Sequence, residues 1–134
     1  MPLGIIRDDI EEQTTAAIRG LEMADVLVFS AGSSVSSRDM TAQIINNLGQ
    51  PGVLIHGLAI RPGKPTVIGL VKGKPAFGLP GNPVSSVVGI ELLVRPALKK
   101  MQGLDDLSRR LPVQVDEIVP LNRRRAVALS LIHI

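Results

Sequence analysis

The sequence predicts an α/β fold, a three-layer α/β/α sandwich with a mostly parallel sheet, and three observations support this class. Segments with helical spacing alternate along the chain with short apolar runs. Those runs are rich in leucine, isoleucine and valine, which is typical of strands covered by helices on both faces. Proline and glycine gather where several runs end, as they do in turns. Strands that alternate with helices indicate parallel βα units and hence a layered arrangement.

The first half of the chain predicts a helix, a strand and a second helix. Apolar residues recur every three or four positions over residues 10–21, and Asp9 can cap this helix with Glu12 three residues later. The run VLVFS at residues 26–30 predicts a strand that is buried on both faces. Helical spacing returns in residues 36–49, where a serine can cap the helix and a final glycine can end it.

The second half predicts three strands and one long helix. The strands are expected at residues 52–60, 66–71 and 75–79. The helix has Asn82 as its cap and Pro83 in its first position. We expect Pro96 to kink or interrupt this helix, because proline has no backbone N–H, and Gly103 to end it.

The character of the chain changes after residue 103, which predicts four parts. Residues 1–103 are expected to form one α/β domain, which residues 104–111 follow as a charged linker. Residues 111–121 alternate like a strand with one solvated face, so residues 112–128 are expected to be the beginning of a small β domain. Residues 129–134 match the translation of a common transposase-adaptor sequence used in DNA library preparation, and they are left out of the interpretation.

The composition excludes several classes of site. The chain has no cysteine and two distant histidines, which argues against thiolate or histidine metal sites. It has no apolar run near the length of about 18 residues that a membrane span needs. It also lacks tryptophan and tyrosine, and its two phenylalanines offer little for stacking on nucleic-acid bases. We therefore expect a soluble cytoplasmic protein with a small anionic ligand, and with neither nucleic acid nor a membrane as partner.

Three loops are candidates for binding that ligand, because loops meet beyond the carboxyl ends of parallel strands. They are SAGSSVSSRD (30–39), RPGKP (61–65) and GLPGNPVSS (78–86). The first and third have serines and helix starts that suit an anion, and the same groups also suit ordinary turns and helix caps. Asp39 has two interpretations in the same way, as a magnesium ligand or as a charge in the first helical turn.

The RPGKP loop is stiffened by two prolines and has two cations, Arg61 and Lys64. Together they suit a phosphate or another dianionic tetrahedral oxyanion, and the arginine can donate two parallel hydrogen bonds. A rigid surface hairpin is an equally good interpretation of the same residues. Lys72 and Lys74, on either side of Gly73, predict a solvated turn.

Four motifs in order resemble the gephyrin-like catalytic domain of the molybdopterin molybdenumtransferase family. They are GIIRDD, DVLVFSAGSSVSSRD, IRPGKP and GLPGNPVSSVV, and RPALKKMQG follows them. The resemblance covers roughly residues 3–103. The family usually has GGVSxG where this chain has AGSSVS, so the chain is similar to a variant branch of that family.

The resemblance implies insertion of molybdate into adenylylated molybdopterin, a magnesium-dependent reaction that releases AMP, by a cytoplasmic homodimer. It implies catalytic roles for Asp8, Asp39 and Ser34, with Asp8 and Asp39 at the Mg²⁺ ion. It implies substrate-binding roles for six further residues, which are Arg61, Lys64, Pro65, Gly81, Asn82 and Ser85.

Two other functions stay open at this point. The related molybdopterin adenylyltransferase binds the same pterin, although the PGKP loop and the start of a second β domain favour the molybdenumtransferase. A noncatalytic module that binds molybdopterin or acts as a scaffold is the other alternative. The family's catalytic domain also has an upstream strand and a TGDE-like acidic loop that this sequence lacks, so we expect a fragment, and whether it is active alone is left open.

Overall fold

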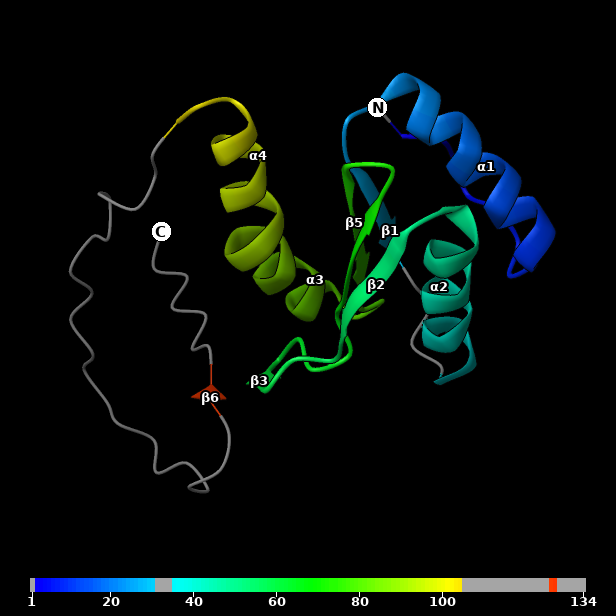
Figure 1. The fold of residues 1–134 in the computed structure, drawn as a ribbon. Coiled ribbons are helices and arrows are strands. Elements are labelled where there is room, and N and C mark those ends of the chain that lie inside the picture. The colour runs from blue at the N-terminus through cyan, green and yellow to red at the C-terminus, as the bar shows by residue number, and fades with distance from the viewer. Residues whose placement is uncertain (1, 31–34, 105–125, 128–134) are drawn as a thin grey trace, which may run out of the picture.

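Helices cover both faces of a four-stranded sheet in the computed structural model, which describes residues 2–30, 35–104 and 126–127. Helices α1 and α2 lie on one side of the strands, and α3 and α4 lie on the other (Figure 1). The α/β class and its three layers are therefore confirmed. The elements are α1 (Ile10–Met23), β1 (Leu27–Ser30), α2 (Val35–Leu48), β2 (Pro51–His56), β3 (Ile60–Arg61), β4 (Val67–Val71), β5 (Lys74–Leu79), α3 (Pro83–Gly89), the π-helix η1 (Ile90–Val94), α4 (Arg95–Met101) and β6 (Ala126–Val127).

The sheet is mixed, which corrects the expectation of a mostly parallel one. Its strand order is β1-β5-β4-β2, in which β1 and β5 pair in parallel and β4 is antiparallel to both β5 and β2. Strands β1, β2 and β5 thus run in one direction and β4 runs against them. The reason is the two-residue turn between β4 and β5, where Lys72 (φ 50°) and Gly73 (φ 80°) both have the positive φ of a tight hairpin.

The strand expected over residues 52–60 is also shorter than predicted. Strand β2 ends at His56, and the chain turns at Gly57, whose φ is +93°. Glycine adopts this left-handed conformation without the steric penalty of a side chain. Within the connection to β4, Ile60–Arg61 form β3 and pair in parallel with β6.

Both predicted helix caps on either side of the sheet are confirmed. The backbone N–H of Glu12 donates to Asp9 Oδ1 over 2.9 Å at the start of α1. The N–H of Ser85 donates to Asn82 Oδ1 over 3.2 Å at the start of α3. Each cap satisfies an N–H that has no partner within its own helix.

The long C-terminal helix changes its winding in front of Pro96, as the missing N–H of that residue led us to expect. A π-helical turn, η1, occupies Ile90–Val94, and Pro96 lies in the first turn of α4. The widened turn interrupts the regular α-helix without ending it. The helix then stops at Gly103, whose φ is +72° and whose N–H donates to the carbonyl of Lys100.

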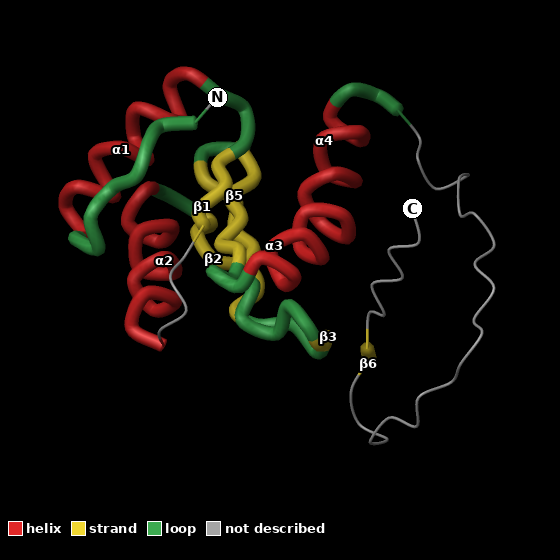
Figure 2. The backbone as a smooth tube through the Cα atoms, turned by 180° about the vertical axis from the view of Figure 1, so that it is seen from behind, coloured by secondary structure: helices red, strands yellow, loops and turns green. Residues whose placement is uncertain are grey.

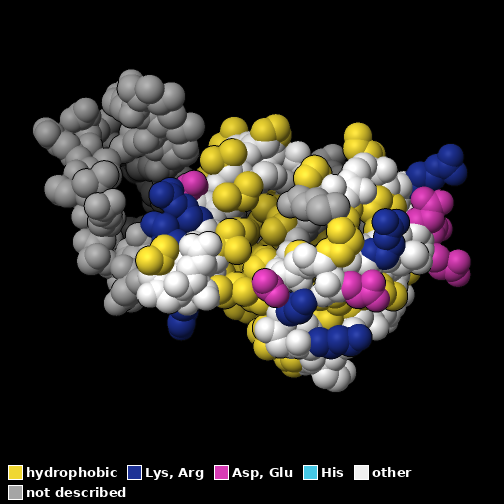
Figure 3. Space-filling model, turned by 90° about the horizontal axis from the view of Figure 1, so that it is seen from above, with side chains coloured by type: hydrophobic (Ala, Val, Ile, Leu, Met, Phe, Trp, Pro, Cys, Tyr) yellow, Lys and Arg dark blue, Asp and Glu magenta, His cyan; other side chains and the backbone are white. Residues whose placement is uncertain are grey.

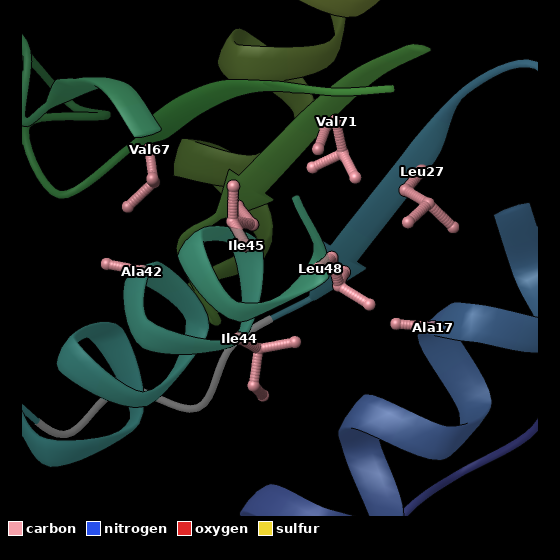
Figure 4. Packing of buried hydrophobic residues seen from close by; sticks show 9 residues of the cluster. Ala17, Leu27, Ala42, Ile44, Ile45, Leu48, Val67 and Val71 are labelled. Atoms are coloured by element: carbon pink, nitrogen blue, oxygen red, sulfur yellow. The ribbon is translucent and has the colours of Figure 1, made fainter. Parts of the chain in front are cut away.

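The main core lies between the sheet and helices α1 and α2 (Figure 4). Ile44 and Ile45 of α2 are fully buried against strand residues such as Val67 and Val71. A second cluster lies on the opposite face of the sheet, where Phe77, Leu79 and Val94 pack together. Interiors of this kind are closely packed, so the two clusters fix how the helices sit on the sheet.

Strand β1 was expected to be buried on both faces, and this is corrected by the structure. Leu27 is buried, while 49% of the Val28 side chain surface is exposed. The reason is the position of β1, which is the outer strand of the described sheet and pairs only with β5. A strand at an edge lacks the neighbour that would help to cover its second face.

Lys74 was expected in a solvated turn, and its side chain instead reaches the end of helix α1. Its Nζ donates to the carbonyl of Leu21 over 2.7 Å and to that of Ala24 over 2.9 Å. The Asp25 carboxylate lies 3.8 Å from the same nitrogen. A cation at a helix C-terminus is favourable because the last carbonyls have no helical partner.

The predicted C-terminal parts fall almost wholly outside the described residues. Only Leu104 of the 104–111 linker is described, and only Ala126–Val127 of the 112–128 segment. The 129–134 tail lies outside them entirely. In the ranges that the structure does describe, no helix has both the length and the apolar character needed to cross a membrane.

Candidate functional site

Three strands end at the same edge of the sheet. Ser30 at the end of β1 pairs with Leu79 at the end of β5, so these two strands finish together. Val67 at the start of β4 is opposite Gly78 of β5 on one side and His56 at the end of β2 on the other. The carboxyl ends of β1, β2 and β5 therefore meet at the same edge, which we call the loop edge.

The six predicted substrate-binding residues belong to two connections at the loop edge. Arg61, Lys64 and Pro65 lie in the connection between β2 and β4, and Gly81, Asn82 and Ser85 follow β5. Figure 2 shows that the connection carrying β3 and the start of α3 leave the same end of the strands. The structure thus brings the second and third candidate loops together, as the sequence predicts.

Helix α2 places Asp39 near the same edge. Thr41, two residues later, is buried directly over β5, because a Cβ added to Gly78 would lie 2.8 Å from Thr41 Cγ2. Asp39 itself is exposed. It is the fifth residue of α2, and the first turn of this helix contains no acidic residue. The interpretation of Asp39 as a first-turn charge is therefore corrected, and its role as a magnesium ligand stays a prediction.

Asp8 belongs to the N-terminal segment of the domain. It precedes α1 and lines a cavity of about 750 Å³. Ser30 at the end of β1 and Thr41 in the middle of α2 line the same cavity, whereas neither Asp39 nor the RPGKP and GLPGNPVSS segments are among its described lining residues. Gln13 Nε2 lies 3.5 Å from Asp8 Oδ1, a long hydrogen bond that leaves most of the carboxylate's accepting capacity unused. Ser34, the third predicted catalytic residue, lies outside the described residues.

The RPGKP connection is a closed and well-bonded loop. The N–H of Leu58 donates to the carbonyl of Lys64 over 2.8 Å, and the N–H of Gly57 donates to that of Thr66 over 2.9 Å. Arg61 and Lys64 are exposed, and neither has an ion pair with another described residue. The loop thus has the closed shape that the hairpin interpretation predicts. Its two exposed cations can also bind an anion.

The GLPGNPVSS turn is held mainly by its own side chains. Asn82 caps α3 through the N–H of Ser85, and the hydroxyl of Ser86 donates to the carbonyl of Pro80. The capping interpretation is therefore confirmed for Asn82. Because the Ser85 N–H is already bonded, that N–H is not a free donor for an anion, and a binding role for Ser85 depends on its largely buried hydroxyl.

The described residues contain no cluster of three or more histidine, cysteine, aspartate or glutamate side chains that could hold a metal by themselves. Asp8 and Asp39 are both exposed and offer one carboxylate each. Mg²⁺ is commonly held in this way, by one or two carboxylates together with waters and the phosphates of a substrate. The donor chemistry of these residues therefore fits a magnesium ion that arrives with a phosphorylated ligand.

Sequence reasoning missed two residues that shape this region. It assigned Thr66 only to a strand, although its hydroxyl is fully buried beside the RPGKP loop. It placed Lys74 in solvent, although that lysine joins β5 to the end of α1. Nothing in the local composition separates these side chains from ordinary strand and turn residues. The role of Thr66 depends on how the loop folds back onto Gly63, and that of Lys74 depends on helix α1, which is distant in the sequence.

Known proteins resemble this chain over most of its described length. A family profile described as "Probable molybdopterin binding domain" matches residues 2–100. A molybdopterin molybdenumtransferase of Haemophilus influenzae is 35% identical over 125 residues, which are 93% of this chain and 30% of that protein. A protein of Methanocaldococcus jannaschii, named for molybdopterin biosynthesis, is 42% identical over 91 residues, which are 68% of this chain and 22% of that protein.

A solved structure is similar in fold as well as in sequence. The molybdopterin biosynthesis MoeA protein from Pyrococcus horikosii superposes with a TM-score of 0.66 at 44% identity. The match covers 75% of this chain and 24% of that one. The chain therefore spans less than a third of the length of each of these three relatives.

Proposed function

Because the chain belongs to the molybdopterin-binding domain family, we propose that it is part of a molybdopterin molybdenumtransferase in molybdenum cofactor biosynthesis. The reaction is the insertion of molybdate into adenylylated molybdopterin, with release of AMP. One observation of the structure carries this proposal, the meeting of the RPGKP loop, the GLPGNPVSS turn and helix α2 at the loop edge. The name of the Haemophilus influenzae relative, which aligns with 93% of the chain, supports the choice of reaction.

In this proposal Arg61 and Lys64 bind the anionic groups of the two substrates. Molybdate is a tetrahedral dianion, and the adenylylated pterin contains phosphates. The two exposed cations have no carboxylate partner among the described residues, so binding these groups does not require an existing ion pair to break. Charge-assisted hydrogen bonds to such oxyanions are about twice as strong as neutral ones.

Asp8, Asp39 and Ser34 have the catalytic roles, with Asp8 and Asp39 holding Mg²⁺. When bound, the ion supplies positive charge that offsets the charge on the phosphate oxygens. Both carboxylates are exposed, and in this proposal each is a ligand of the ion. Pro65, Gly81, Asn82 and Ser85 complete the substrate site by shaping the two turns on which the substrate lies.

The whole protein is proposed to be a cytoplasmic homodimer. Large apolar side chains are exposed along the C-terminal helices, and the set is Val84, Val87, Ile90, Leu92, Leu98 and Met101. Figure 3 shows apolar side chains gathered between the side of the molecule with α4 and the rest of it. Apolar surface of this kind supports burial against another domain or a second copy.

The test is an assay of AMP release by the whole protein that contains this domain. The enzyme is given adenylylated molybdopterin and Mg²⁺, and molybdate is titrated. We expect AMP release to rise with molybdate and to saturate. Release that is independent of molybdate would contradict the proposal.

The same assay separates the two alternatives. A molybdopterin adenylyltransferase would form adenylylated molybdopterin from ATP and molybdopterin, which is detected as ATP consumption without molybdate. A scaffold module would bind molybdopterin without turnover of any nucleotide. The RPGKP loop with two available cations favours the molybdenumtransferase over both, since molybdate is an additional anion that only this reaction must hold.

A further inference from the structure

Thr66 has a buried hydroxyl at the base of the RPGKP loop. The residue is fully buried, and its Oγ1 donates to the carbonyl of Gly63 over 2.7 Å. Its backbone N–H donates to the same carbonyl over 3.1 Å. A buried hydroxyl requires a partner, so this pair of bonds fixes Gly63 relative to the first residue before β4.

The same residue closes the loop from its other end. The carbonyl of Thr66 accepts from the N–H of Gly57, which directly follows β2. One residue further into the loop, the carbonyl of Lys64 accepts a hydrogen bond from the N–H of Leu58. Thr66 thus takes part in three of the hydrogen bonds that hold the connection between β2 and β4, and the two cations lie inside that connection.

The loop also rests on helix α3. A Cβ added to Gly63, whose φ is +111°, would lie 4.0 Å from Val88 Cγ1, and a Cβ added to Gly89 would lie 4.0 Å from Thr66 Oγ1. Gly63 and Thr66 therefore face consecutive residues of α3. This helix begins at the Asn82 cap, so the RPGKP loop packs against the helix that follows the GLPGNPVSS turn.

We propose that Thr66 is a positioning residue that holds Arg61 and Lys64 in the orientation needed to bind the tetrahedral oxyanion. The identity of that oxyanion as molybdate rests on the proposed function. The physical reason is preorganisation, since cations that are already oriented lose less conformational freedom on binding. Thr66 does not touch the oxyanion, and it acts through the Gly63 carbonyl and the closed loop.

Two variants of Thr66 in the whole protein separate the effect of the hydroxyl from the effect of the side-chain shape. Thr66→Val keeps the branched shape and removes the donor, and Thr66→Ser keeps the donor and removes a methyl group. We expect Thr66→Val to raise the KM for molybdate roughly 3- to 10-fold, the equivalent of one hydrogen bond, while kcat stays within about twofold. Thr66→Ser should bring the KM back toward the original value.

The matched control is Thr15→Val, which makes the same chemical change on exposed helix α1. Hydrogen exchange gives a second readout that does not depend on turnover. Thr66→Val should speed the exchange of the Leu58 and Thr66 amides, and Thr66→Ser and Thr15→Val should leave it nearly unchanged. A merely structural role would lower the melting temperature of Thr66→Val without a selective change in the molybdate KM.

The outcomes distinguish this inference from the proposed function. Unchanged molybdate KM in Thr66→Val overturns the positioning role, whether or not the loop amides exchange faster. If the original protein releases AMP without any dependence on molybdate, the proposed function fails. The positioning role is then decided by equilibrium dialysis of molybdate and of phosphate, in which Thr66→Val should bind at least one of them more weakly than Thr66→Ser does. Equal binding of both oxyanions by the two variants overturns it.

Discussion

Position distinguishes the two cations of the RPGKP loop from the other basic residues at the turns of the sheet. Arg61 and Lys64 are exposed at the loop edge, whereas Lys72 lies in the hairpin turn at the opposite end of β4. Lys74 is already bound to the end of α1. Position along the strands therefore separates cations that can serve a ligand from those that cannot.

The first prediction compares Lys64 of the RPGKP loop with Lys72 of the hairpin turn. Lys64→Gln should weaken molybdate binding roughly 10- to 100-fold, because a charged hydrogen-bond donor contributes about 1.5–3 kcal/mol. The measurement is the KM for molybdate in the AMP-release assay with the whole protein. Lys72→Gln is the matched control and should leave the KM unchanged. Equal effects of the two substitutions would mean that net charge, and not the RPGKP loop, governs binding.

At the scale of the elements, a glycine in β5 allows helix α2 to pack closely against the sheet. A Cβ at Gly78 would lie 2.8 Å from Thr41 Cγ2 and 3.2 Å from Val67 Cβ, closer than packed side chains normally come. Glycine at this position lets α2 approach β5, and Asp39 is part of the same helix. The distance between α2 and the GLPGNPVSS turn thus depends on the absence of a side chain at Gly78.

The second prediction tests this contact. Gly78→Ala should destabilise the domain by about 1–3 kcal/mol, as overpacking of a core typically does. Urea unfolding measures the change. Thr41→Ser removes the methyl group that the new side chain would meet, so the double variant should recover part of the loss. If the double variant is as unstable as the sum of both single variants, the contact is not the cause.

The third prediction concerns the tie between β5 and α1. Lys74→Met keeps most of the side-chain length and removes the donor to the Leu21 and Ala24 carbonyls. We expect a loss of about 1 kcal/mol in the free energy of unfolding, since water can replace part of these bonds. The urea midpoint measures it, with Lys72→Met as control. A loss of the same size in the control would show that the contribution is not specific to the end of α1.

The elements that the sequence predicted well are those whose signals are local. The caps at Asp9 and Asn82 and the helix stop at Gly103 each depend on residues within one helical turn, and each was confirmed. The reversal of β4 and the exposure of Val28 depend on which strands become neighbours. Those pairings join residues that are distant in the sequence, so alternation of helices and strands could not reveal them.

At the scale of the whole molecule, the loop edge was predicted for a reason that is only partly true. The sequence placed the candidate loops at the carboxyl ends of parallel strands. Strands β1, β2 and β5 do end at one edge, but β4 begins there, so Thr66, the residue before β4, lies at this edge as well. The convergence could be predicted from strand direction, whereas the hydroxyl that supports it could not.

The fourth prediction belongs to the whole protein. Removal of Mg²⁺ with EDTA should abolish AMP release, and added Mg²⁺ should restore it, because two carboxylates and substrate phosphates form the proposed site. Asp39→Asn should require a higher Mg²⁺ concentration for half-maximal release. Turnover that is unaffected by EDTA would contradict the magnesium proposal, and an unchanged Mg²⁺ requirement in Asp39→Asn would remove Asp39 from it.

The hairpin turn at Lys72 and Gly73 also has a practical use. A Cβ at Gly73 would meet nothing within 4 Å, and the turn lies at the end of β4 and β5 away from the loop edge. Exposed loop tips of this kind tolerate inserted sequence better than other parts of a fold. A fluorescent reporter or an immobilisation tag could therefore be spliced between these two residues, and oxyanion binding could be followed at the far end of the same two strands.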